Sequence, residues 1–353
     1  NLYGDVYSLG RLDIARDDAG SRAASLRNLS GVIESGKDFS LRASLIENRR
    51  AVLESKSGLY TAKMEQTACI EGVNAGDCSG KRNAIWTITQ RDKTEVTASS
   101  AMGQLLADSA ARVEAANSLN VQAGRDIANL GGVLQSRGDL SLDAGRDVTV
   151  AAVEDRQGQT RWNTSRLQSV TQLGAEVSAG RDLNVSAGRD LSAVASALEA
   201  RRDIALSAGR DVTLAAAANE EHAYSKTRKV TYQEDKVAQQ GTRVDAGGDL
   251  AINAGQDLRL IASQASAGDE AYLVAGDKLE LLAANDSNYY LYDKKKKGDF
   301  GRKETRRDEV TDVKAVGSQI NSGGDLTLLS GGDQTYQGAK LESGNDLAIV
   351  SGG

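Results

Sequence analysis

Aspartates recur at a fixed interval through the second half of the chain, and this repeat limits the possible fold more than any other feature. The intervals alternate between about 8 and 13 residues, as in the series Asp182, Asp190, Asp203 and Asp211. Most of these aspartates follow a glycine or a Gly-x pair and precede an apolar triplet, such as 212–214, whose first and third residues are aliphatic. A period of about 21 residues that contains a two-residue alternation is typical of a solenoid.

Each triplet predicts a short strand whose first and third residues point inward, because residues i and i+2 share a face of a strand. Stacked turns would lie about 4.8 Å apart and pair in parallel. We therefore predict an all-β fold, a right-handed parallel β-helix of roughly nine or ten coils and about 45 Å in length.

The Gly-x-Asp sequences between triplets are the expected corners of this solenoid. The glycine is expected to take a positive φ, and the aspartate to accept a hydrogen bond from the amide two residues on. These structural corners include Gly124, Asp126, Gly145, Asp147, Gly188, Asp190, Gly209 and Asp211.

Stacked Gly-Asp corners also occur in calcium-binding β-rolls, which are the main alternative for this pattern. That fold needs a nine-residue repeat in which two half-turns surround each ion. Here the period is about 21 residues, and an arginine often precedes the aspartate, as at Arg146, Arg189 and Arg210. The pattern therefore favours turn-forming aspartates whose mutual repulsion a neighbouring arginine reduces, with no metal and no cofactor.

The composition fits one elongated body with a narrow interior. The 353 residues include 37 glycines, no proline and 4% aromatic residues. No run of 18 apolar residues is present, so no membrane-spanning helix is expected. A net charge of −6 and a pI near 5.2 argue against nucleic acid as a partner. The chain has no signal peptide at Asn1 and begins and ends within repeats, so we expect a segment of a larger protein.

Interruptions of the repeat divide the chain into three parts. We expect coils at 1–54, an irregular insertion at 55–110, and coils again at 111–353. Three further insertions fall at about 154–173, 218–242 and 285–316. Each of these three lies in the long interval of the repeat, so all should emerge on one side of the solenoid. Alternating sequences within them predict strands, and we interpret the insertions as β-arms beside the helix.

The insertion at 55–110 contains both cysteines of the chain, Cys69 and Cys78. Glycines and polar residues between them permit a small closed loop, and the single histidine, His222, is far away in the sequence. A disulfide is therefore preferred to a metal site and would indicate an oxidising compartment. Two unrelated thiols are the alternative.

The third of the later insertions concentrates aromatic and basic residues that suit an anionic interface. Tyrosine rings can lie at headgroup depth while basic side chains reach phosphates. The candidate surface-binding residues are Tyr289, Tyr290, Tyr292, Lys294, Lys295, Lys296, Lys297, Arg302 and Lys303. The alternative is a solvated arm whose lysines keep a sheet edge from pairing with other chains.

The repeat unit reads Ala-Gly-x-Asp-Leu-x-Leu-x-Ala, is broken by Tyr/Lys-rich inserts and resumes with the Gly-Ser-Gln-Ile of 317–320. In these respects the chain resembles the haemagglutinin repeats of filamentous-haemagglutinin proteins, which are two-partner secretion exoproteins. Residues 112–353, approximately, resemble the second-type repeat, and 23–54 resemble the first-type repeat.

The resemblance implies a non-enzymatic segment of a secreted filament at the surface of a Gram-negative bacterium, exported through an outer-membrane two-partner secretion transporter. It implies adhesion or, as in the contact-dependent growth inhibition members, a part in toxin delivery. The contacted partner would be a receptor, lipopolysaccharide or the outer membrane of a bacterial or host cell.

The alternative function is that of a β-helix that binds or cleaves polysaccharide. Such an enzyme needs two or three carboxylates and a base in one groove. The aspartate repeat offers stacked carboxylates, but turn geometry already explains their positions. His222 lies in a polar insertion, where a solvated loop residue is the favoured interpretation.

Overall fold

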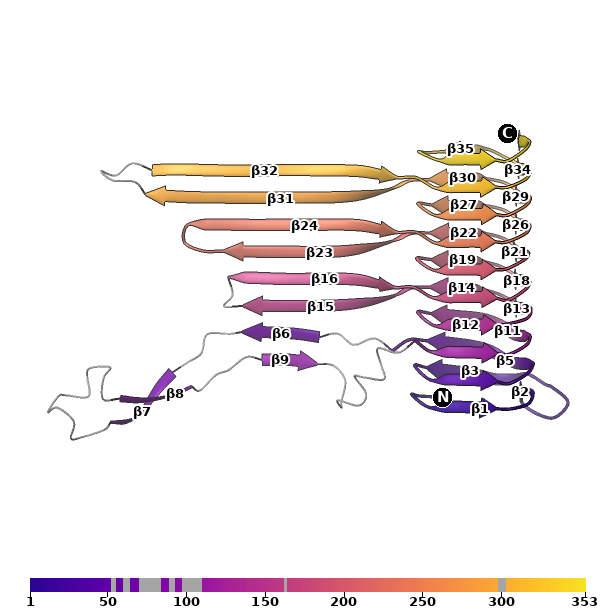
Figure 1. The fold of residues 1–353 in the computed structure, drawn as a ribbon, viewed down its shortest axis with the longest axis horizontal. Coiled ribbons are helices and arrows are strands. Elements are labelled where there is room, and N and C mark those ends of the chain that lie inside the picture. Colours follow the sequence, from indigo (N-terminus) through magenta and orange to yellow (C-terminus); the bar gives the residue numbers. More distant parts are fainter. Residues whose placement is uncertain are drawn as a thin grey trace.

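The computed structural model describes residues 1–353 apart from 52–54, 60–63, 70–83, 89–92, 97–109, 162–163 and 298–302. Every element in this described part is a strand, and none of it is a helix that could cross a membrane. Most strands wind into a parallel β-helix, and the others form a flat sheet that projects from one side of it (Figure 1). The chain therefore has the predicted parallel β-helix fold.

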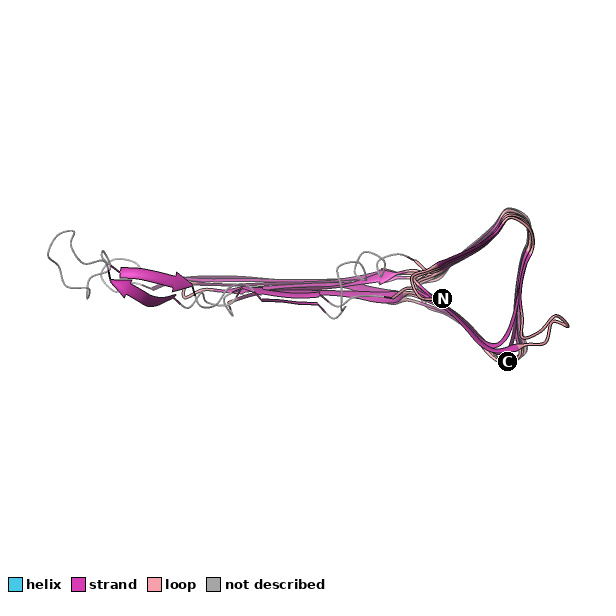
Figure 2. Ribbon diagram, turned by 90° about the horizontal axis from the view of Figure 1, so that it is seen from below, coloured by secondary structure: helices cyan, strands magenta, loops and turns pink. Residues whose placement is uncertain are grey.

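The helix has a triangular cross-section, because each coil contributes a strand to each of three sides (Figure 2). The first side contains β1 (Asp5–Ser8), β4 (Val32–Ser35), β10 (Arg112–Ala115), β12 (Val133–Ser136), β17 (Glu176–Ala179), β20 (Ala197–Ala200), β25 (Arg243–Ala246), β28 (Gln264–Ala267), β33 (Gln319–Ser322) and β36 (Lys340–Ser343). The second contains β2 (Leu12–Ile14), β13 (Leu140–Ala144), β18 (Leu183–Ala187), β21 (Ile204–Ala208), β26 (Leu250–Ala254), β29 (Ala271–Ala275), β34 (Leu326–Ser330) and β37 (Leu347–Ser351). The third contains β3 (Ala23–Leu29), β14 (Val148–Ala151), β19 (Leu191–Val194), β22 (Val212–Ala215), β27 (Leu258–Ile261), β30 (Leu279–Leu282) and β35 (Gln334–Tyr336). Two longer strands, β5 (Phe39–Arg49) and β11 (Leu119–Leu130), run through both the second and third sides.

The ten strands of the first side correspond to ten coils in the described part of the chain, in line with the nine or ten expected. Where no insertion intervenes, equivalent residues pair 21 positions apart, as Leu183 does with Ile204 and Leu250 with Ala271. These four side chains are at most 1% exposed. Burying one large aliphatic side chain contributes about 1.5–3 kcal/mol, so stacking stabilises strands that are too short to persist alone.

The insertions form one continuous sheet, here called the fin, in the order β32-β31-β24-β23-β16-β15-β6-β9. Its strands are β6 (Ser55–Leu59), β9 (Lys93–Val96), β15 (Val153–Arg161), β16 (Ser165–Leu173), β23 (Ala217–Lys226), β24 (Val230–Gln240), β31 (Ala284–Lys297) and β32 (Lys303–Val316). Neighbouring strands are antiparallel except β6 and β15, which are parallel. The insertion at 55–110, expected to be irregular, thus supplies two strands of the fin and a separate pair, β7 (Met64–Cys69) and β8 (Ala84–Ile88).

The fin is continuous because its strand spacing equals the coil spacing. The insertions follow the second, fourth, sixth and eighth coils, counted along the first side. Two coils rise about 9.6 Å, and a hairpin of two strands at about 4.8 Å each fills the same height. Each hairpin therefore meets the next one, as β16 meets β23 and β24 meets β31. The sequence predicted arms on one side, but not that the arms would join.

Close stacking, and not a positive φ, requires glycine at the corner positions Gly145, Gly188 and Gly209, whereas a Cβ atom at Gly124 would meet no atom closer than 3.3 Å. A Cβ atom at Gly209 would lie 2.3 Å from the carbonyl oxygen of Gly188, and one at Gly255 would lie 2.2 Å from that of Gly209. Among described residues, the glycines with positive φ are Gly20, Gly131 and Gly338. The predicted corner glycines are not among these three, so the predicted positive φ is wrong. Glycine is needed at most corners for another reason, because the preceding coil occupies the space that a side chain would fill.

Replacing Gly255 by Ala should therefore destabilise the helix by about 1–3 kcal/mol, since the added methyl group overlaps backbone of the coil below. The measurement is urea unfolding followed by circular dichroism. Gly10→Ala is the matched control, because a Cβ atom there meets nothing within 4 Å. Equal urea midpoints of unfolding for Gly255→Ala and Gly10→Ala would contradict the stacking explanation.

Candidate functional site

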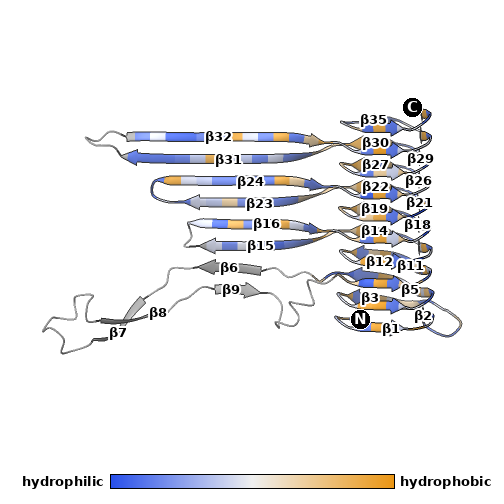
Figure 3. Ribbon diagram, viewed as in Figure 1, coloured by the Kyte–Doolittle hydropathy of each residue, from blue (hydrophilic) through white to orange (hydrophobic). Residues whose placement is uncertain are grey.

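The outer ends of the fin, farthest from the helix, carry most of its described cations. These are Arg166, Lys226, Arg228, Lys229, Lys294, Lys295, Lys296, Arg306 and Arg307. The part nearer the helix carries Glu154, Asp155, Glu220, Glu221, Glu234, Asp235, Asp286 and Asp312. Hydrophilic colours dominate the outer part of β31 in Figure 3. The fin is thus polarised, with its basic end directed away from the helix.

Strand alternation divides the predicted surface-binding residues between the two faces of the fin. Residues i and i+2 share a face, and so do residues directly opposite on neighbouring strands. Face A carries Tyr290, Tyr292, Lys294 and Lys296, and face B carries Tyr289, Leu291, Asp293 and Lys295. The sequence grouped these tyrosines and lysines as one surface, but only four of the six candidates whose side chains are described lie together on face A.

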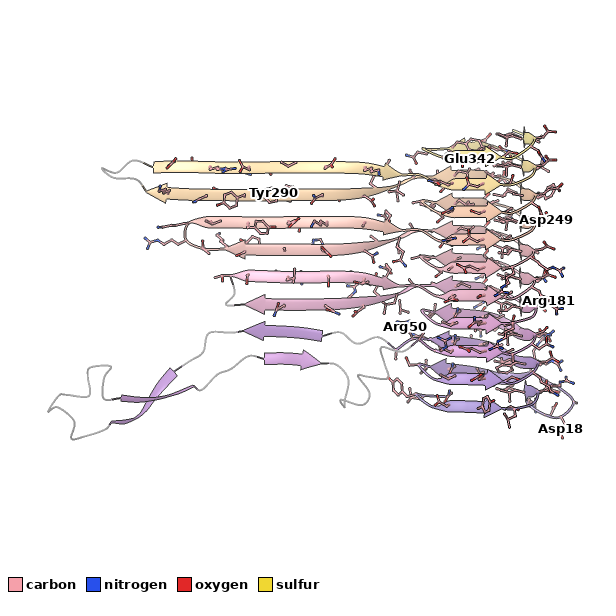
Figure 4. The ribbon with its side chains drawn as sticks, viewed as in Figure 1. Asp18, Arg50, Arg181, Asp249, Tyr290 and Glu342 are labelled. Atoms are coloured by element: carbon pink, nitrogen blue, oxygen red, sulfur yellow. The ribbon has the colours of Figure 1, made fainter. Side chains whose placement is uncertain are left out.

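On face A, three tyrosines of two hairpins pack together. Tyr232 of β24 lies opposite Tyr292 of β31. Its ring meets that of Tyr290 edge to face, with centroids 5.7 Å apart and an interplanar angle of 81°. Figure 4 places Tyr290 within the fin, away from the helix. The contact between the hairpins therefore creates an aromatic cluster that neither hairpin has alone.

The carboxylates beside this cluster are already paired. Glu234 lies 2.8 Å from the Lys236 ammonium and also accepts a hydrogen bond from the Tyr232 hydroxyl. These contacts, that of Lys236 first, lower the pKa of Glu234. The hydrogen bond to Glu234 raises the pKa of Tyr232 to about 12, so its hydroxyl stays protonated. Asp308 is bound by Arg306 at 2.7 Å.

On face B, the described charges of the β31–β32 hairpin are held in local pairs. Arg307 lies 2.7 Å from Glu309, and the Tyr289 hydroxyl donates to the same carboxylate at 2.9 Å. Lys295 lies 3.9 Å from Asp293. The hydrogen bond to Glu309 raises the pKa of Tyr289. The cations of β31 and β32 on this face are therefore balanced by their neighbours, whereas Arg166 and Lys226 of the same face have no ion pair among the described residues.

Several predicted residues lie outside what the structure describes. Arg302 and Cys78 fall in undescribed segments, and the side chains of Lys297, Lys303 and Cys69 are likewise outside the described part. Their proposed roles, including the disulfide, stay predictions.

His222 belongs to a strand of the fin and not to a solvated loop, contrary to the sequence interpretation. Its Nδ1 lies 3.0 Å from Asp235 Oδ1, and its Nε2 lies 3.2 Å from Glu220 Oε2. These contacts, led by the hydrogen bond with Asp235, raise the pKa of His222. The pairing depends on the register of β23 with β24, which the sequence alone did not provide.

Arginines join the aspartates of successive coils at the corner between the second and third sides. Arg146 donates to both carboxylate oxygens of Asp126 in the preceding coil, at 2.7 and 2.6 Å, and this lowers the pKa of Asp126. The same contact joins Arg189 to Asp147 and Arg210 to Asp190. The arginines thus bridge coils as well as separating like charges.

Aspartates at the corner between the first and second sides bind the next coil. Asp203 Oδ1 accepts a hydrogen bond from the Asp249 amide at 3.1 Å, and Asp249 Oδ1 accepts one from the Glu270 amide at 3.0 Å. The predicted bond to the amide two residues on is therefore wrong at these corners, because stacking places an amide of the next coil over each carboxylate. Figure 4 shows Arg181 and Asp249 at the side of the helix opposite the fin.

A repeat family described as Hemagglutinin repeat matches residues 51–166, 157–233, 224–302 and 297–353, which is most of the chain. The chain belongs to the haemagglutinin-repeat family. A second family, described as Haemagglutinin repeat, matches residues 9–68 of this haemagglutinin-repeat chain. The resemblance inferred from the motif is confirmed, although the match over 51–166 includes the insertion that was expected to separate the two repeat types.

Curated relatives of the haemagglutinin-repeat chain include three proteins with the name CdiA. The Deoxyribonuclease CdiA of Dickeya dadantii is 33% identical over 232 residues, which is 64% of this chain and 7% of that protein. The 16S rRNA endonuclease CdiA of Enterobacter cloacae is 28% identical over 340 residues, 86% of this chain and 10% of that protein. The tRNA nuclease CdiA of Escherichia coli is 29% identical over 205 residues, 54% of this chain and 6% of that protein. No solved structure matches the chain.

The chain therefore spans a tenth or less of the length of these relatives. Its repeats are those of secreted exoproteins at the surface of Gram-negative bacteria, and it is a segment of a large protein of that kind, as predicted.

Replacing Asp249 by Asn should stabilise the haemagglutinin-repeat helix by ~0.5 kcal/mol, because Asp249 lies between Asp203 and Glu270 and like charges on adjacent strands repel. Asn keeps a side-chain oxygen that can accept the hydrogen bond from the Glu270 amide. Thermal unfolding is the measurement. The matched variant Asp190→Asn should instead lower the midpoint, since it breaks the paired contact with Arg210. A lower midpoint for Asp249→Asn would exclude repulsion at that corner.

His222 should titrate above its usual pKa of 6.5, because both neighbouring carboxylates favour the imidazolium. The stabilisation it gives β23 and β24 is complete below 6.5, the pKa in the unfolded chain, and is lost as the pH rises through the higher folded pKa. His222 is the single histidine of the chain, so one proton NMR signal reports the titration. Asp235→Asn should lower the midpoint of the His222 titration. A titration midpoint at or below 6.5 in the wild-type protein would contradict the contact between His222 and Asp235.

Proposed function

We propose that this segment is a shaft of a contact-dependent exoprotein, and that its fin touches the anionic surface of a neighbouring cell. The shaft would be non-enzymatic and would serve adhesion or toxin delivery. The parent protein would be exported through an outer-membrane transporter partner. The relatives are named as nucleases, and we assign no nuclease chemistry to this segment.

The observation that supports surface contact is the position of the cations. Lys294, Lys295 and Lys296 lie at the outer end of β31. Lys294 pairs with Val230, the first residue of β24, and Lys295 and Lys296 lie beyond that pair. They are exposed and lie on the longest described hairpin of the fin. A surface that approaches the outer end of this hairpin would meet these residues.

The continuity of the fin supports the same role. A single arm of two strands is marginal in water, whereas hairpins that pair with one another hold their side chains in fixed rows. The helix beneath fixes the spacing of the hairpins through its own coil stacking. The fin is therefore suited to present charge over an extended line instead of at one mobile tip.

The polysaccharide alternative has a specific location on the first side of the helix. A groove there is lined by Glu199 and Asp245, which lie opposite each other on β20 and β25, together with Gln135 and Arg243. Arg243 donates to Asp245, so one of the two carboxylates is already engaged. Turnover of uronate polymers or host glycans by the purified segment, abolished by Glu199→Gln, would favour this alternative over surface contact.

Substituting Gln for the six candidate cations Lys294, Lys295, Lys296, Lys297, Arg302 and Lys303 should abolish salt-sensitive binding to lipopolysaccharide and to anionic vesicles. Each cation near an anionic surface contributes about 1 kcal/mol. Sedimentation with vesicles at increasing salt measures the effect, and circular dichroism should be unchanged because these residues lie outside the coils.

A control variant with Gln at Arg137, Arg201, Lys278 and Lys340 removes charge from the helix instead and should bind nearly as wild type does. Wild-type protein that associates with no anionic vesicle, lipopolysaccharide or intact cell would refute the proposed function, and the fin cations would then only protect a sheet edge.

A further inference from the structure

The two faces of the β31–β32 hairpin differ in their free charge, although each carries tyrosines and lysines. This difference decides which face can bind a ligand, and the inference drawn from it rests on the proposed function. On face B, Lys295 and Arg307 each have an acidic partner, and Tyr289 uses its hydroxyl on Glu309. An anion on face B would have to compete with these carboxylates.

On face A, the acidic groups next to the tyrosines are neutralised. Lys236 holds Glu234, and Arg306 holds Asp308. Lys294 and Lys296 are exposed, and no ion pair to either is found within the described residues. Glu304, which lies opposite Lys296 on β32, is the acid nearest to them in register. Face A therefore offers two available cations beside an aromatic cluster.

The spacing of these groups suits a sugar that carries an anionic substituent. Tyr290, Tyr292, Lys294 and Lys296 follow one another along β31 at intervals of about 6.8 Å. Each interval is comparable to one sugar ring with its substituent. A tyrosine ring has an apolar face and a polar hydroxyl, which matches a pyranose with its C–H face and its hydroxyl groups. Tyr232 supports the ring of Tyr290 from the neighbouring hairpin.

Outside the row of tyrosines and lysines, face A mixes polar and apolar side chains, since Leu167 and Val310 lie on it and are 52% and 57% exposed. The strands that continue it carry Ser225 and Ser169, together with Gln157 and Gln159. Hydroxyl and amide groups both donate and accept hydrogen bonds.

We propose that face A of the fin binds an anionic saccharide, with sugar rings packed on Tyr290 and Tyr292 and a phosphate or carboxylate held by Lys294 and Lys296. The shared chemistry is a pyranose with a negative substituent. Its source is a phosphorylated sugar of lipopolysaccharide or a carboxylated sugar of a host glycan.

Two variants with the same loss of charge test the choice of face. Lys294→Gln with Lys296→Gln should weaken binding to purified lipopolysaccharide or to a uronate oligosaccharide by at least about tenfold. Arg166→Gln with Arg307→Gln should change binding by less than about twofold, because both side chains lie on face B, away from the tyrosine cluster. Equal weakening by both pairs would overturn the choice of face while leaving the proposed function intact. Wild-type protein without affinity for any anionic surface would remove the proposed function itself.

The saccharide part of the proposal is tested through the tyrosines and a ligand without sugar. Tyr292→Ala should weaken binding to whichever of lipopolysaccharide and the uronate oligosaccharide the wild-type protein binds. Tyr289→Ala, on face B, should leave that binding unchanged. Vesicles of phosphatidylglycerol should bind more weakly than that saccharide and should be indifferent to Tyr292→Ala. Vesicle binding as tight as saccharide binding, with no effect of Tyr292→Ala on either, would overturn the saccharide assignment. Circular dichroism of each variant verifies that the fin is intact.

Discussion

Parallel stacking of coils at a spacing of about 4.8 Å is the constraint on which the whole molecule depends. It buries aliphatic columns such as the one through Leu183, Ile204 and Leu250, none more than 1% exposed. The same spacing excludes side chains at corner glycines, since a carbonyl of the coil below fills the place of a Cβ atom. Core, corners and fin are all consequences of this one distance.

The spacing of the coils in the helix sets the spacing of the hairpins in the fin. An insertion after every second coil supplies two strands for every two coils, so the arms pair without a gap. The resulting sheet is a single layer with both faces in solvent (Figure 2). Pairing between hairpins also assembles Tyr232 with Tyr290 and Tyr292 on face A, beside Lys294 and Lys296. Surface contact by this protein is therefore proposed to depend on the periodicity of its shaft.

Charge is arranged differently along the helix and along the fin. At one corner of the helix, Arg146 joins Asp126 to the next coil, whereas later coils stack acids such as Asp249 over Asp203 with only an amide hydrogen bond between them. Within the β31–β32 hairpin, face B pairs its charges locally and face A leaves two lysines available. The distribution of paired and unpaired charge, more than net charge, distinguishes structural positions from candidate binding positions.

The sequence by itself determined the parallel β-helix, its 21-residue period, its inward residues and the side from which the insertions emerge. Each of these follows from local spacing, and the pairing of Leu183 with Ile204 bears out that period. Only the tertiary structure decided why Gly209 must be glycine, which amide Asp203 binds, and that Tyr289 and Tyr290 face opposite ways. It also decided that the arms join and that His222 meets Asp235. These features depend on register between segments distant in sequence, and a local pattern carries no information about which residues of two coils or two hairpins will lie opposite each other.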